Sequence, residues 1–359
     1  MDSACCLSGL ASDGRPGSAV ISVIIPVYNA IDYLEECFAS LEKQHYPLFE
    51  VVLVDDGSTD GSSELCDELA LRGVCVKVIH QSNGGQQAAR SAGVMGSSGD
   101  YVMFLDSDDC LRSDALGIIS TLVGKEPYDI VCFDYARGVT LNYEKGVLGD
   151  SLLVPGAYSG SEYDAVFSAV CSGEFNNLAT KAVKKEIALK ALDCLEGIEG
   201  LRHGEDLLYL VSIVEHAKSL YCLPDVLYFY RENPNSMSSC FSETQISDLS
   251  IVFHFLTKTA SSWGAKYEKA SKCAAIKHYY WVLMSLNSSG LGPNKKRECV
   301  ASIASGVESV CGRETRARIS DLRVDFRLPM NLAISGKWRA ALFAVGVVER
   351  LARIGSHCF

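Results

Sequence analysis

The sequence lacks several motifs by which common ligand-binding proteins are recognised. It has no GxGxxG after its first apolar run and no GxxxxGK[ST] anywhere, which disfavours a dinucleotide site of the Rossmann kind and a P-loop. No CxxC pair occurs, so zinc sites built on that spacing are disfavoured as well. We also find no internal repeat and no low-complexity tract.

Basic residues are in deficit. The chain has 33 Lys and Arg against 44 Asp and Glu, a formal net charge of −11, and no long run of Lys or Arg. Binding to a phosphate backbone needs a basic surface, so nucleic acid is not expected as a partner. An anionic small ligand can still be held by a metal ion and a few local cations.

Apolar residues are plentiful: they make up 48% of the 359 residues, enough for one large domain with an accessory region, or for two domains. The 15 cysteines are scattered through apolar segments, and Cys37, Cys66, Cys75 and Cys132 look like small core residues. This usage favours a reducing compartment, the cytoplasm. Residues 1–18 lack the basic start and apolar stretch of a secretory signal, and we expect a flexible N-terminus there.

Apolar runs of strand length alternate with helical patterns over the first 105 residues. The expected strands are 20–26, 49–54, 74–79 and 101–105, and the expected helices are 31–43, one that ends near Leu71, and 86–95. Such alternation predicts parallel βαβ units with right-handed crossovers, and thus an α/β fold. Strand-like pieces at 130–135 and 220–231 follow, and a helical C-terminal region is expected at 241–359.

Polar loops follow four of these strands, at 26–29, 55–58, 82–85 and 106–109. Because the carboxyl ends of parallel strands share one rim of a sheet, where ligands bind in such folds, these loops should form one site.

The strand at 101–105 runs straight into three carboxylates, those of Asp106, Asp108 and Asp109. Crowded carboxylates repel one another unless a cation neutralises them, and hard divalent cations prefer oxygen ligands. The segment therefore predicts a metal ion that meets an anionic ligand. A solvated acidic turn is the alternative, since Asp and Ser are ordinary turn residues.

Two of the other loops have features that suit a nucleotide. Tyr28 can offer a flat ring to a base, and a carboxylate of the 55–61 segment can accept from a ring N–H of a pyrimidine. The alternatives are a packed Tyr in a turn and a helix cap made by Ser58, Thr59 or Asp60.

Gly84 and Gly85 precede a helix, which suits the approach of a ligand to backbone N–H groups. Arg90, one turn into that helix, could reach a phosphate or a ribose.

Taken together, these stretches resemble the family 2 glycosyltransferases of the GT-A fold. The residues that carry the resemblance are VISVIIPVYNAIDYLEECFASLEKQ, FEVVLVDDGSTDGS, QSNGGQQAARSAGVMGSSGDYVMFLDSDD, HGEDLLY and YFYRENPNSMSS. It covers roughly residues 20–240, about 60% of the chain. The implied architecture is a GT-A-like, Rossmann-type, mostly parallel sheet flanked by helices, with a catalytic domain at 19–240.

The resemblance also implies roles for single residues in a nucleotide-sugar site. Pro26 and Tyr28 would line the base, Asp56 would bond its edge, and Arg90 would lie by the nucleotide. In the DxD-like run, Asp106 would be nearer the ribose, while Asp108, with Asp109 beside it, would bind Mn²⁺ or Mg²⁺.

The later segments would supply catalysis and phosphate contacts. Asp206 of the ED-like pair would be the catalytic base with Glu205 beside it, and Arg231 and Ser236 would belong to a loop that closes over the diphosphate. The alternative for the acidic pair is a first helical turn favoured by the helix dipole.

Two departures from the family pattern leave specificity open. Gln86-Gln87 stands where many relatives have small or apolar residues, and Leu178 and Ala182-Val183 replace bulkier residues near the expected acceptor.

The implied reaction is inverting transfer of a sugar from a nucleotide donor, such as a UDP-sugar, to a hydroxyl of a glycan or lipid-linked acceptor in cell-surface polysaccharide synthesis. A nucleotidyltransferase and a non-catalytic nucleotide-sugar-binding protein are the alternatives.

Near the end of the chain, Lys337 to Arg353 carries an apolar run of nine residues, 340–348, with basic residues at its ends. A bilayer span needs about 20 apolar residues. This segment is therefore expected either to cap the core or to lie peripherally on the inner face of a membrane.

Overall fold

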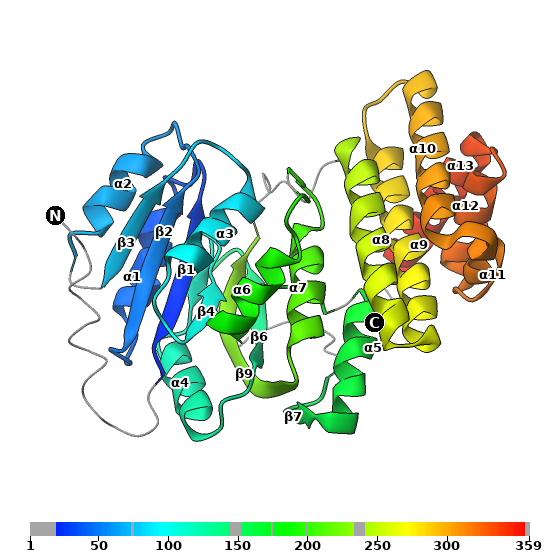
Figure 1. Ribbon diagram of the computed structural model, residues 1–359. Helices are drawn as coiled ribbons and strands as arrows, with labels where there is room; N and C mark the ends of the chain where they lie inside the picture. Colours follow the sequence, from blue (N-terminus) through cyan, green and yellow to red (C-terminus); the bar gives the residue numbers. More distant parts are fainter. Residues whose placement is uncertain are drawn as a thin grey trace. The chain divides into compact units, whose positions relative to one another are not determined.

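The computed structural model describes residues 19–72, 75–143, 153–173, 175–198, 200–232 and 241–355 (Figure 1). By its internal contacts the chain forms two units. The first comprises Met1–Val166, Phe175–Leu201 and Tyr209–Asn233, and the second comprises Phe167–Glu174, Arg202–Leu208 and Pro234–Phe359. The expected flexible N-terminus at 1–18 lies outside the described residues.

Nine strands of the first unit form one sheet in the order β3-β2-β1-β4-β8-β6-β9-β5, with β7 beside β9. Their bounds are β1 Ile21–Val27, β2 Phe49–Asp55, β3 Val76–His80, β4 Tyr101–Phe104, β5 Cys110–Leu111, β6 Ile130–Gly138, β7 Gly156–Ser159, β8 Lys181–Lys184 and β9 Ser219–Arg231. The strands β3, β2, β1 and β4 pair in parallel, as predicted. Next to β4 the sheet becomes mixed, because β8 pairs antiparallel with both β4 and β6.

Helices cover both faces of the parallel strands. The α-helices between residues 34 and 216 are α1 Leu34–Glu42, α2 Ser62–Leu69, α3 Gln86–Gly96, α4 Ala115–Lys125, α5 Asp164–Ser172, α6 Lys185–Asp193 and α7 Glu205–His216. Val23 and Ile25 share a core with Phe38 of α1 and Leu116 of α4. On the other face Ile24 packs so closely on Gly93 of α3 that no Cβ would fit there. Strands buried on both faces are apolar throughout, which explains why these runs could be recognised in the sequence. The predicted α/β fold class is confirmed.

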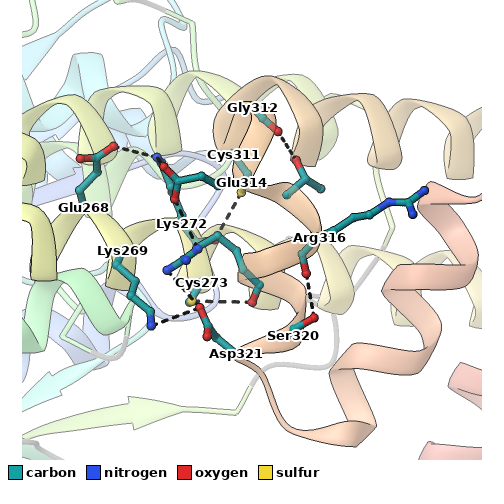
Figure 2. Close-up of polar contacts among 12 residues, drawn as sticks. Glu268, Lys269, Lys272, Cys273, Cys311, Gly312, Glu314, Arg316, Ser320 and Asp321 are labelled. Carbon is teal, nitrogen blue, oxygen red and sulfur yellow. Dashed lines mark hydrogen bonds and ion pairs between the residues drawn. The ribbon is translucent and has the colours of Figure 1, made fainter.

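The predicted helical C-terminal region is also confirmed. Its helices are α8 Thr244–Trp263, α9 Ala265–Ser288, α10 Pro293–Cys311, α11 Thr315–Ser320, α12 Val324–Ile334 and α13 Trp338–Gly355. A cluster of ion pairs ties α9 to the segment between α10 and α12 (Figure 2). Buried Lys272 lies 2.7 Å from Glu268 and 3.3 Å from Glu314, and Arg318 lies 3.0 Å from Asp321.

Three of the four cysteines expected in the core, Cys37, Cys66 and Cys132, are buried, and Cys75 is partly buried. Within the described parts of the chain, none of the helices combines the length and the apolar character that a bilayer span requires.

Candidate active site

The turn after β1 and the loop after β2 are bonded to each other at the carboxyl rim of the sheet. Asn29, at a φ of 50°, accepts the N–H of Thr59 at 2.8 Å and donates its own N–H to the Ser58 hydroxyl at 3.1 Å. Pro26 is buried in β1, whereas Tyr28 is 54% exposed. The ring of Tyr28 therefore stands at the rim, where a flat ligand can stack on it.

Asp56 is buried beneath the loop that leads into α3, and its side chain binds that loop. One carboxylate oxygen accepts from Gln81 Nε2 at 2.7 Å and from the Gly84 N–H at 2.8 Å, and the other accepts from the Gly85 N–H at 2.8 Å. Gly57 must stay without a Cβ, because that atom would lie 2.9 Å from the backbone nitrogen of Asn83. The structure thus brings Asp56, Gly84 and Gly85 together, as contacts of one another.

Beside Asp56, the buried carboxylate of Asp55 forms a pair with His80 at the end of β3, 3.0 Å from Nδ1. Burial opposes ionisation of Asp55, but hydrogen bonds from His80 and Ser58 hold the pKa of Asp55 below its usual value. The same bond, with help from Asp67 at 3.2 Å, raises the pKa of His80. No sequence motif singles out His80 as a partner of Asp55.

Arg90 of α3 is nearly buried and points at residues 106–109 after β4, which we call the acidic loop. Its Nη2 lies 3.0 Å from Asp106 Oδ1, and Gln86 Nε2 lies 3.1 Å from the same oxygen. The guanidinium lies 5.7 Å from the ring centroid of Phe104, which is the last residue of β4. Arg90 and Asp106, both predicted to contact the nucleotide, are therefore paired, and the Gln86 side chain joins them.

Asp109, expected beside the metal, is 1% exposed and has a hydrogen bond on each carboxylate oxygen. Tyr228 donates its hydroxyl to Oδ2 at 2.5 Å, and Arg231 donates its backbone N–H to Oδ1 at 2.8 Å. Burial, and then the nearby charge of Asp106, raise the pKa of Asp109 to about 8. Asp109 thus fastens the acidic loop to the end of β9, and Tyr228, which the sequence did not single out, is its partner.

The Arg231 side chain reaches across the same loop. Its Nε donates to the backbone oxygen of Asp108 at 2.9 Å, and its Nη2 lies 2.6 Å from Glu36 of α1. The guanidinium also lies 5.6 Å from the centroid of the Tyr33 ring. The predicted phosphate-binding cation is therefore held beside the acidic loop by Glu36, a residue that sequence reasoning missed.

The carboxylates that follow β4 fit a divalent cation that takes some of its ligands from the substrate. Asp106 and Asp108 are partly exposed at the end of β4, and one or two carboxylates are what Mg²⁺ takes from a protein when phosphates and water complete its shell. Over the ranges that the structure describes, no three His, Cys, Asp or Glu side chains form a ready-made metal cluster. An ion held here would take its other ligands from a diphosphate and water.

The acidic pair Glu205-Asp206 forms the first turn of α7, directly after Gly204, whose φ is 83°. By its contacts this turn belongs to the second unit, while α7 from Tyr209 onward belongs to the first. Tyr209 packs edge-on against Phe104, with centroids 6.1 Å apart. The pair is thus in a different unit from the rim residues, and Ser236 lies outside the described residues.

Comparison with known proteins identifies relatives in sequence. Residues 22–149 match the profile "Glycosyl transferase family 2". The chain is 29% identical over 220 residues to the glycosyltransferase EpsJ of Bacillus subtilis, covering 61% of this chain and 63% of EpsJ. It is 39% identical over 119 residues to the glycosyltransferase GlyG of Streptococcus pneumoniae, covering 33% of this chain and 40% of GlyG. The chain thus spans less than two thirds of the length of these relatives.

Comparison with solved structures supports the fold. The crystal structure of S. aureus TarS in complex with UDP-GlcNAc has a TM-score of 0.68 at 19% identity, covering 93% of this chain and 92% of that chain. At this identity the likeness shows a shared GT-A-like architecture, helical region included. From the profile match we conclude that residues 22–149 are a segment of glycosyl transferase family 2.

Proposed function

We propose that the protein is an inverting glycosyltransferase that moves a sugar from a nucleotide donor, a UDP-sugar, to a hydroxyl of a glycan or lipid-linked acceptor. Residues 19–240 would form the catalytic domain and 241–359 a helical region. The observation that carries the proposal is the meeting of the loops after β1, β2 and β4 with the end of β9 at one rim of the sheet. The glycosyltransferase relatives and the UDP-GlcNAc complex of TarS support this class of donor.

The base and ribose of the donor would lie between the turn after β1 and the loop before α3. Pro26 and Tyr28 would line the base, and Asp56 would hold the Gly84-Gly85 backbone in place while its carboxylate edge meets the base. Arg90 and Asp106, already paired at 3.0 Å, would orient the ribose and the first phosphate. Because these groups are held by the protein's own hydrogen bonds, little ordering is needed when the donor binds.

Breaking the bond between the anomeric carbon and the diphosphate builds negative charge on the leaving phosphate oxygens. A Mn²⁺ or Mg²⁺ ion on Asp108, with Asp106 nearby, would stabilise that charge as a Lewis acid. Arg231, fixed beside this loop by Glu36, would add a positive charge at the same end. Asp109 would keep the loop in position through Tyr228, in addition to the metal contact inferred from the family pattern. Ser236 is assigned to the diphosphate on the family pattern alone.

The acceptor hydroxyl must lose a proton as it attacks the anomeric carbon from the face opposite the leaving group. We assign that proton to Asp206, with Glu205 beside it. The assignment rests on the family pattern, in which the ED-like pair supplies the catalytic base. A single displacement of this kind inverts the configuration at the anomeric carbon.

The proposal is tested by incubating the protein with a panel of UDP-sugars and Mn²⁺ or Mg²⁺ and measuring UDP release and the linkage of the product. We expect release that chelation abolishes and that Asp108→Ala removes. Pyrophosphate release from a nucleoside triphosphate would favour a nucleotidyltransferase instead. Donor binding without turnover, with every acceptor offered, would point to a binding protein.

We place the enzyme in the cytoplasm, at the inner face of a membrane where lipid-linked acceptors are extended. The similarity to EpsJ and EpsH of Bacillus subtilis supports the glycosyltransferase activity, and we assign a role in cell-surface polysaccharide synthesis on the family pattern.

A further inference from the structure

The charge of the chain is divided sharply between its two parts. Residues 1–240 contain 16 basic and 35 acidic residues, a formal charge of −19, whereas residues 241–359 contain 17 basic and 9 acidic residues, a formal charge of +8. The net charge of −11 hides this contrast. An asymmetry of this kind points to an anionic partner for the basic part.

The last helix, α13, is buried on one side only. Ala341, Leu342 and Val345 are buried against its neighbours. Phe343 is 74% exposed, Val347 37% and Leu351 63%. These three recur every four residues, so they form one apolar stripe along the helix, which we call the α13 stripe. A soluble helix that merely caps a core would carry polar residues there.

Basic residues border the α13 stripe. Arg339 precedes Phe343 by four residues and Arg350 follows it by seven, so both lie on the same side of the helix as the stripe, and both are exposed. Lys337, just before the helix, is exposed as well. On the adjacent helix α12, Val324 and Leu328 are 70% and 54% exposed. Large apolar side chains bordered by arginines are the composition of a helix that lies in a membrane interface.

We propose that the α13 stripe is a docking surface for an anionic lipid bilayer, with Phe343, Val347 and Leu351 inserted among the acyl chains and Arg339 and Arg350 at the lipid phosphates. A second copy of the chain fits less well, because like charges on two copies of α13 would meet. A soluble polyanion would use the arginines and leave the apolar side chains in water. The inference rests on the proposed membrane location but not on the transfer reaction.

The test is co-sedimentation of the full chain with vesicles of phosphatidylcholine, with and without phosphatidylglycerol. We expect binding to the anionic vesicles that weakens with added salt. The variant Phe343→Ser/Val347→Ser/Leu351→Ser should bind at least about tenfold more weakly, because it loses the inserted apolar area. The variant Arg339→Glu/Arg350→Glu should lose the preference for anionic vesicles.

Matched controls distinguish the contribution of the α13 stripe to vesicle binding from non-specific effects of exposed apolar side chains and of net charge. Leu71→Ser/Met95→Ser/Val139→Ser removes three other exposed apolar side chains, and Arg297→Glu/Arg316→Glu makes the same charge change on other exposed helical residues. Both controls should bind like the wild-type protein. All changes are at exposed positions, so unchanged circular dichroism is expected.

The proposal is overturned if the wild-type protein ignores anionic vesicles, or if the controls lose binding as much as the stripe variants do. It is equally overturned if the wild-type protein binds polyphosphate and the triple-serine variant binds both polyphosphate and the vesicles as strongly as the wild type does. That result would mean that the partner of this surface is a soluble polyanion. UDP release in solution is measured alongside, so failure of the membrane surface and failure of the transfer reaction give different results.

Discussion

The α/β part and the helical part of this chain use their charged residues in opposite ways. At the sheet rim, carboxylates such as Asp56 and Asp109 are buried and bonded to the protein's own N–H and O–H groups. On α13, Arg339 and Arg350 are exposed beside bare apolar side chains. On the function proposed above, the first arrangement would hold a site in a fixed shape for a small anionic ligand and a cation. On the further proposal, the second would present a surface to a large anionic partner. Sugar transfer and membrane docking should therefore be separable, so that substitutions at the sheet rim leave vesicle binding intact and substitutions on α13 leave UDP release intact.

Apart from substitutions of the proposed metal ligands, the largest effect is expected from Asp206→Asn. If Asp206 is the base, this change should lower acceptor-dependent UDP release by a factor of about 10²–10⁴, the usual contribution of general base catalysis. Donor binding and vesicle binding should stay as they are. Glu205→Gln is the matched control, with a smaller expected loss. Near-normal turnover in Asp206→Asn would remove Asp206 from the catalytic role and leave the acidic turn as a helix-dipole feature.

Asp56→Asn should weaken the fold as well as the binding of the nucleotide-sugar donor. The substitution replaces a carboxylate oxygen that accepts a backbone N–H with an amide NH₂ group, which cannot accept that hydrogen bond. We expect a loss of about 1–3 kcal/mol in the free energy of unfolding, measured by urea titration, and a raised donor KM. Asp32→Asn, at an exposed position, is the control. Unchanged stability with weakened UDP binding would show that Asp56 serves the base alone and does not hold the loop.

A pair of neighbouring glutamates on α1 isolates the support of Arg231. Glu36 bonds Arg231 at 2.6 Å, whereas Glu35 bonds Arg72 at 2.7 Å on the exposed surface. Glu36→Gln should raise the Mn²⁺ concentration for half-maximal activity several-fold, up to about tenfold, because Arg231 then holds the acidic loop less firmly. Glu35→Gln should change nothing. Equal behaviour of the two variants would mean that Glu36 is an ordinary surface partner.

The smallest effect is expected from His80→Gln. Because Asp55 and Asp67 raise the pKa of His80, its ion pairs contribute stability that is complete below the ordinary value of 6.5 and is lost as pH rises through the raised pKa. The lowered pKa of Asp55 gives a contribution that is present above 3.8 and is lost as pH falls through the lowered pKa. Thermal melts should therefore separate the variant from the wild type by about 2 °C or less near pH 5.5, and not at pH 9. The opposite pH trend would contradict this pairing.

Much of the fold could be predicted from the sequence because the central strands are buried on both faces. The runs at 20–26, 49–54 and 101–105 match β1, β2 and β4 to within one residue. The short strands β5, β7 and β8 were missed, since two to four residues such as Cys110–Leu111 carry no periodicity and become strands only through their partners.

The residues of the candidate site could be predicted only in part, as could the fold. Residues that follow a strand, such as Asp56 and Asp106, could be assigned to one rim from the topology rule alone. Their partners could not: Glu36 meets Arg231 across 195 positions, and Tyr228 meets Asp109 across 119. Contacts at such separations form only when the whole sheet has folded, so no local sequence pattern predicts them. The exposure of the α13 stripe likewise depended on which side of the helix its neighbours cover.

The central claim, that a nucleotide diphosphate and a metal ion meet at the end of β4, is tested most directly by titrating UDP into the protein calorimetrically, with and without Mn²⁺. Three proteins suffice: the wild type, Asp108→Ala, and Asp193→Ala as a control at an exposed carboxylate. The account predicts Mn²⁺-dependent UDP binding by the wild type and by Asp193→Ala, and its loss in Asp108→Ala. UDP binding that is equal in all three proteins, or absent from the wild type, would contradict it.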